Sequence, residues 1–185
     1  MSGWDSLIAP YTAPPAAPEI GGGVVDSAYV VNGLMERGLP QHVAEAFAMN
    51  MQDESGFDPG INEINPTVKG SRGGYGLYQL TGPRRRAYEA FAAERGTALN
   101  DPDAQLDFLV MELAGPEKRA AERIMSTSNA GEAGAAVVNY FLRPAEKHRP
   151  AREAKYLGGA QPAPQQQVQN FNRLWLDMGI GGSNG

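Results

Sequence analysis

Apolar side chains recur at every third or fourth position through the middle of the chain. This spacing places them on one face of an α-helix. It is clearest at Val43, Phe47 and Met51, and again at Leu106, Leu109, Val110 and Leu113. The pattern predicts a mostly α domain, with helices at residues 24–37, 40–54, 83–95, 101–114, 116–128, 131–143 and 150–157. In the first helix it predicts an apolar face of Ala28, Val31 and Met35.

Proline and glycine mark the ends of these helices. A proline stands in the first turn of several of them, where its missing N–H is not needed. Pro40, Pro83, Pro102 and Pro116 hold such positions, and Asp101 is placed to cap the fourth helix. Residues 57–82 differ, because turn residues alternate there with short β-prone runs. We expect a small β hairpin set into the helical domain.

The two ends of the chain have another character. Residues 9–23 and 158–167 are rich in Pro, Ala, Gly or Gln, a composition typical of linkers. Beyond the second linker, helical spacing returns at Val168, Phe171, Leu174, Trp175 and Met178. The expected organisation is an N-terminal tail (1–23), one domain (24–157), and a linker with an amphipathic docking helix (158–185). An exposed apolar stripe of this kind is typical of a protein interface.

The amino-acid composition excludes several classes of protein and of functional site. The chain has 185 residues, of which 42% are hydrophobic, no cysteine, two histidines and a formal net charge of −5. Disulfide scaffolds and cysteine nucleophiles are excluded, and a zinc site built from several histidines is not expected. An acidic chain does not predict nucleic-acid binding. We find no apolar run long enough to span a membrane and no signal peptide, and we expect neither metal nor cofactor.

Glu54 is the first candidate for chemistry. It falls at the carboxyl end of a predicted helix, where the negative end of the dipole disfavours an ionised carboxylate. If Phe57 and Tyr75 also shield it, its pKa would be raised, as a general acid requires. The alternative is an ordinary solvated acid.

Residues 73–80 add the materials of a sugar-binding site. Glycines at 73, 74 and 76 stand beside Tyr75, Tyr78 and Gln79. Aromatic faces can stack on pyranose rings, and an amide can bind acetamido groups. Tyr75, Tyr78 and Gln79 are therefore the predicted substrate-binding residues of this segment.

Together these two segments resemble the lysozyme superfamily. Glu54-Ser55-Gly56-Phe57 followed by Tyr75-Gly76-Leu77-Tyr78-Gln79-Leu80 is similar to its pair of motifs. Residues 105–113 and 137–144, and the basic turn with Arg149 and Arg152, look most like phage tail lysozymes. The resemblance covers about residues 24–157. It implies a lysozyme-like α+β domain that cleaves the β-1,4 bond between N-acetylmuramic acid and N-acetylglucosamine in peptidoglycan, with Glu54 as catalytic acid.

The second carboxylate is less clearly marked. The c-type lysozymes carry an aspartate just before the Tyr-Gly of the second motif, where this chain has Gly74. Glu63, nine residues beyond Glu54, is the best-placed alternative, and Asp58 is another. A site without a second acid would resemble lytic transglycosylases, in which groups of the sugar itself take part.

Two basic clusters complete the candidates. Arg84, Arg85 and Arg86 stand in the first turn of a predicted helix, where the dipole opposes them. They either bind carboxylates of the muramyl peptide, with Arg86 as the named candidate, or anchor the hairpin through Asp or Glu, or are solvated. The second cluster is a basic turn of Lys147, His148, Arg149 and Arg152, which either pair with neighbouring acidic residues or belong to a ligand site.

The resemblance and the tails together predict the setting. We expect a virion-associated muramidase that is held by other tail proteins through its terminal segments. It would act in the host cell wall or periplasm during genome entry. Two alternatives stay open, an inactive structural tail component with a lysozyme fold and an endolysin.

Overall fold

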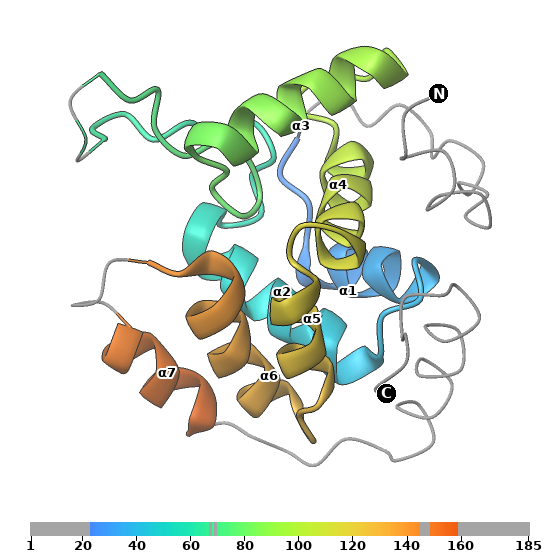
Figure 1. The fold of residues 1–185 in the computed structure, drawn as a ribbon, viewed down its shortest axis with the longest axis vertical. Coiled ribbons are helices and arrows are strands. Elements are labelled where there is room, and N and C mark those ends of the chain that lie inside the picture. Colours follow the sequence, from blue (N-terminus) through green and yellow to red (C-terminus); the bar gives the residue numbers. More distant parts are fainter. Residues whose placement is uncertain (1–22, 67, 69, 145–148, 159–185) are drawn as a thin grey trace, which may run out of the picture.

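The computed structural model describes residues 23–66, 68, 70–144 and 149–158. In this part the chain is mostly helical (Figure 1). The helices are α1 (Ser27–Glu36), α2 (Gln41–Ser55), α3 (Gly82–Arg95), α4 (Pro102–Ala114), α5 (Lys118–Met125), α6 (Ala130–Ala136), the π-helix η1 (Val137–Leu142) and α7 (Arg149–Leu157). The predicted linkers and docking helix lie outside the described residues.

Helix boundaries follow the residues that the sequence marked. Asp101 accepts hydrogen bonds from the N–H groups of Asp103 and Ala104, and Pro102 occupies the first turn of α4. Gly56 and Gly96 close α2 and α3 in the left-handed conformation. A left-handed residue ends a helix at little cost when it is glycine. The described helices thus lie close to their predicted ranges, and none is long and apolar enough to cross a membrane.

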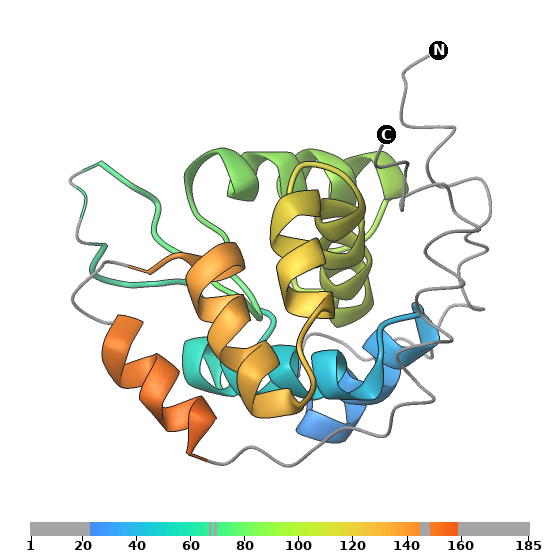
Figure 2. The same cartoon turned by 60° about the horizontal axis from the view of Figure 1, so that its bottom comes forward.

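Helix α2 forms the centre of the core. Val43, Phe47 and Met51 are buried, as the pattern predicted. The ring of Phe47 meets that of Phe141 edge-on, with centroids 5.3 Å apart, which links α2 to η1. Helices α3 and α7 lie at opposite ends of the molecule in both views (Figures 1 and 2). The C-terminal end of α2 contacts α7 through Glu54 and Arg152, and it continues directly into the segment that begins at Phe57.

The predicted face of the first helix was wrong. The structure buries Val30, Gly33 and Leu34, whereas Met35 is exposed. At Gly33, a Cβ atom would lie 2.8 Å from Leu106 Cδ1 of α4. The absence of a side chain at Gly33 lets α1 pack closely against α4, and Val30 and Leu34, which lie on the same side of the helix as Gly33, are buried with it.

The expected hairpin at residues 57–82 is not found as strands. Within the described part of this segment, pairing is limited to isolated antiparallel bridges, Asn62 with Tyr75 and Tyr75 with Leu80. The backbone turns between them, with positive φ at Gly76 (73°) and Gln79 (52°). An extended ladder cannot continue through left-handed residues. The segment, which we call loop 57–81, is held by isolated backbone hydrogen bonds together with hydrogen bonds from side chains.

Candidate active site

Glu54 lies in the last turn of α2 and is paired with a cation. Arg152 of α7 donates from Nη1 to Glu54 Oε1. The side chain of Glu54 is 16% exposed and that of Arg152 24%, so the pair reaches solvent. The sequence predicted apolar neighbours for this carboxylate, and Phe57 is indeed buried nearby in the chain. The structure adds a guanidinium that donates to one carboxylate oxygen of Glu54.

Asp53, the neighbour of Glu54, is held by the same helix. Lys155 Nζ lies 2.6 Å from Asp53 Oδ1, and the hydroxyl of Tyr156 donates to Oδ2 at 2.7 Å. Desolvation alone would raise the pKa of Asp53, but these hydrogen bonds outweigh it and the pKa is lowered. Desolvation and the hydrogen bond to Asp53 raise the pKa of Tyr156. Helix α7 thus contacts both acids at the end of α2.

Ser55 joins the two sequence motifs in space. Its buried hydroxyl lies 2.9 Å from the carbonyl oxygens of both Met51 and Leu77, and accepts from the N–H of Phe57. Leu77 belongs to the Tyr75–Leu80 motif, whereas Ser55 directly follows Glu54. A single side chain therefore fixes the end of α2 against the second half of loop 57–81.

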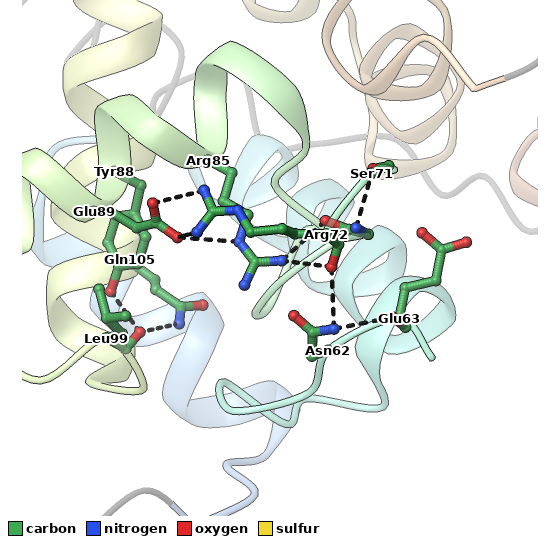
Figure 3. A network of polar contacts seen from close by, with 10 residues as sticks. Asn62, Glu63, Ser71, Arg72, Arg85, Tyr88, Glu89, Leu99 and Gln105 are labelled. Carbon is green, nitrogen blue, oxygen red and sulfur yellow. Dashed lines mark hydrogen bonds and ion pairs between the residues drawn. The ribbon is translucent and has the colours of Figure 1, made fainter. Parts of the chain in front are cut away.

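A buried amide from α4 holds both halves of that loop. Gln105 accepts from the N–H of Leu77 at 2.7 Å, and its Nε2 donates to the carbonyl oxygens of Pro59 (2.7 Å) and Leu99 (2.9 Å). The contact with Leu99 is drawn in Figure 3. A Cβ atom at Gly76 would lie 2.4 Å from Gln105 Oε1. Glycine is required there by space as well as by its positive φ.

Glu63 is fixed to the backbone at Gly74. Its N–H donates to Gly74 O at 2.8 Å, and Gly74 N donates back to Glu63 Oε2 at 3.0 Å. A Cβ atom at Gly74 would lie 2.4 Å from Gln79 Oε1, so a larger residue there would displace the side chain of Gln79. The structure therefore holds the carboxylate of Glu63 at the backbone of Gly74, the residue just before Tyr75-Gly76 of the second motif.

Of the three adjacent arginines, Arg84 and Arg85 hold other parts of the structure in place, and Arg85 holds loop 57–81. Arg85 donates from Nε to Glu89, which also receives two hydrogen bonds from Arg72 at 2.8 Å (Figure 3). Arg85 also donates to the carbonyl oxygens of Arg72 and Gly73. This is the anchoring role that the sequence left open. Arg86 is exposed.

The assignment of Tyr78 as a stacking residue is corrected by the structure. Its side chain lies in the core, 2% exposed, with its hydroxyl 3.2 Å from Glu112 Oε2. Arg84 donates two hydrogen bonds to that same carboxylate, at 2.7 and 2.8 Å. Burial raises the pKa of Tyr78 well above its ordinary value. Nothing in the sequence marked Glu112 as the partner of Tyr78 and Arg84, because it is only one acidic residue within a helix of apolar periodicity.

The other predicted binding residues remain nearer the surface. Tyr75 is half-buried, and the guanidinium of Arg85 lies 5.0 Å from its ring centroid. Gln79 is half-buried, and its Nε2 donates to Gly76 O at 3.1 Å. In the part of the chain that the structure describes, no group of three His, Asp or Glu residues could hold a metal ion.

A helical domain with a glutamate at a helix end, tied to a glycine-rich loop that carries a second acid, defines a lysozyme-like class of protein. A family model described as phage tail lysozyme matches residues 26–156. The chain belongs to this family, which confirms the resemblance of its motifs and indicates a peptidoglycan-hydrolysing, lysozyme-like function. No curated protein matches the sequence.

The hydrogen bonds of Gln105 predict that its amide stabilises the fold. Gln105→Leu keeps the volume but leaves the N–H of Leu77 and the carbonyl of Pro59 without this partner. We expect the free energy of unfolding to fall by about 3 kcal/mol, because each buried polar group left unpaired costs about 1–3 kcal/mol. Urea denaturation measures this loss. Gln52→Leu, at an exposed position of α2, is the control and should change stability by at most about 0.5 kcal/mol. Equal stability of the two variants would show that the amide does not hold the loop.

Proposed function

We propose that this protein is a muramidase that hydrolyses the β-1,4 bond between N-acetylmuramic acid and N-acetylglucosamine. Glu54 is the general acid and Glu63 the second carboxylate. The observation that carries the proposal is the contact of Ser55 with Leu77, which keeps Glu54 beside the loop on which Glu63 is held by Gly74. Membership of the phage tail lysozyme family supports the same chemistry.

In this mechanism Glu54 donates a proton to the glycosidic oxygen as the bond to the anomeric carbon breaks. Glu63 then either orients the attacking water or stabilises the oxocarbenium-like state. The hydrogen bond from Gly74 supports this role, because a carboxylate that accepts from the backbone is held in place.

Substrate binding is proposed for Tyr75, Gln79 and Arg86. Tyr75 and Gln79 lie on the loop that Ser55 joins to Glu54, and Arg86 presents an exposed cation at the start of α3. The buried Tyr78 is left out of this set.

Substitution of Glu54 tests the catalytic acid. Glu54→Gln preserves the shape of the side chain but has no proton to donate, so we expect the release of reducing ends from peptidoglycan to fall by about 10²–10⁴-fold. Glu45→Gln, elsewhere on α2, is the control and should retain wild-type turnover. A thermal melt shows whether the fold is kept. Full activity of a folded Glu54→Gln variant would contradict the mechanism.

Substitution of Glu63 separates hydrolysis from a transglycosylase reaction. We expect Glu63→Gln to lower the turnover strongly, by about 10²-fold, because the amide can neither activate water nor stabilise positive charge as a carboxylate does. Mass spectrometry of the products gives the second readout. Unchanged turnover together with 1,6-anhydro product ends would assign the transglycosylase mechanism instead.

The inactive tail component is a second candidate, and one observation favours it. Arg152 pairs with Glu54, so the carboxyl group is already engaged by another side chain of the protein. The Glu54→Gln experiment distinguishes the candidates, since an inactive wild-type protein would digest nothing in either form.

We further propose that the protein is carried by the virion and acts during genome entry, with its terminal segments bound to other tail proteins. The apolar positions from Val168 to Met178 support this, because a linker separates them from the catalytic domain in the sequence.

A shortened chain tests the docking role. Residues 24–160 should remain folded and digest peptidoglycan, yet fail to join the particle, which immunoblots of purified virions would measure. In the full chain, Trp175→Ala should weaken incorporation, because a Trp anchor in an interface contributes about 2 kcal/mol or more. A melting temperature many degrees lower in the absence of residues 161–185 would show that the segment belongs to the domain itself. Absence of the full chain from virions would favour the endolysin.

A further inference from the structure

The pairing of Glu54 with Arg152 conflicts with the role of an acid. Arg152 Nη1 donates to Glu54 Oε1, whereas a general acid needs a carboxyl oxygen that is free to contact the glycosidic oxygen. The other titratable groups close to this pair are Asp53 from α2 and Tyr156 from α7, and Asp53 is itself occupied by Lys155. Of these groups, only Arg152 contacts Glu54 with a positive charge.

Helix α7 is held in place by contacts other than the one that Arg152 makes. Tyr156 is buried and donates to Asp53, and a Cβ atom at Gly134 of α6 would lie 3.1 Å from its Cγ. Lys155 binds Asp53, and Arg149 donates to Pro144 O at 2.9 Å. Arg152 can therefore swing away from Glu54 while the helix stays in position.

A carboxylate is the natural competitor for that guanidinium. Arginine binds carboxylates through paired hydrogen bonds, and both side chains of the pair are partly exposed. Peptidoglycan carries carboxylates on its peptide stems, and glycan strands freed of peptide carry one on each lactyl group. The substrate of the proposed function thus brings the group that Arg152 would bind.

We propose that Arg152 is a positioning residue that makes Glu54 available only when a substrate carboxylate is bound. This inference rests on the proposed function. When the guanidinium moves to the substrate, Glu54 takes a proton from solvent and passes it to the leaving oxygen. Water then supplies hydroxide to the anomeric carbon and returns one proton to solvent, so atoms and charge balance. Arg152 couples recognition of the acidic substrate to the acid chemistry.

A matched pair of substrates tests this coupling. Peptidoglycan and the same preparation with its carboxyl groups converted to amides are digested by the full-length protein, and kcat and KM are measured for each. We expect the wild-type rate to fall by about tenfold or more on the amidated material, the effect of losing one hydrogen bond to a charged group. Peptide-free glycan strands form a third arm, and a wild-type rate as high as on intact peptidoglycan would assign the lactyl carboxylate as the trigger.

The variants give the decisive comparison. Arg152→Gln should digest native and amidated peptidoglycan at similar kcat, because Glu54 is no longer held. Arg152→Lys keeps the charge and should restore the preference in part. Lys155→Gln removes a cation from the same helix without touching Glu54, so it should keep the wild-type preference.

Two results would overturn the proposal. Arg152→Gln with the same preference as wild type would show that the residue does not sense the substrate carboxylate. If Arg152→Gln lost activity by the same factor on native and on amidated peptidoglycan, Arg152 would have a structural role only. If Arg152→Gln fails to fold, Arg152→Met, which keeps the apolar stem, is read in the same way. These outcomes are distinct from failure of the proposed function, which full activity of Glu54→Gln would show.

Discussion

The amide of Gln105 is the contact on which the geometry of the candidate site depends. It is fully buried and binds backbone groups before and after the turn of loop 57–81, at Pro59 and Leu77. A segment with only isolated bridges has no ladder to define its path, so a buried side chain that pairs with its backbone groups must do so. Ser55 then transfers this order to the end of α2, and hence to Glu54.

In loop 57–81 a carboxylate is held at the backbone of another residue. A Cβ atom at Gly74 would lie 2.4 Å from Gln79 Oε1, so a side chain there would displace the amide of Gln79. The N–H of Gly74 holds the carboxylate of Glu63, which comes from the preceding part of the loop. A carboxylate can thus be placed beside one backbone position from elsewhere in the loop, provided that the backbone there offers a donor.

The basic residues take distinct roles according to their partners. Arg84 is bound with Glu112 and Tyr78, and Arg85 ties loop 57–81 to α3. Arg152 is paired with the proposed catalytic acid. The side chains of Arg84 and Arg152 are equally exposed, at 24%, but Glu112 is 4% exposed and Glu54 16%, so a ligand can reach the second pair more readily.

The sequence by itself determined the helices, their ends and the family, because apolar spacing, Pro and Gly placement and the motif around Glu54 are local properties. It also placed Glu63 among the candidates. Tertiary structure decided the rest: the buried face of α1, set by close approach at Gly33; the burial of Tyr78; and the contact between Glu54 and Arg152, which are 98 residues apart. These depend on which segments meet in space, and residue spacing along a chain carries no record of that.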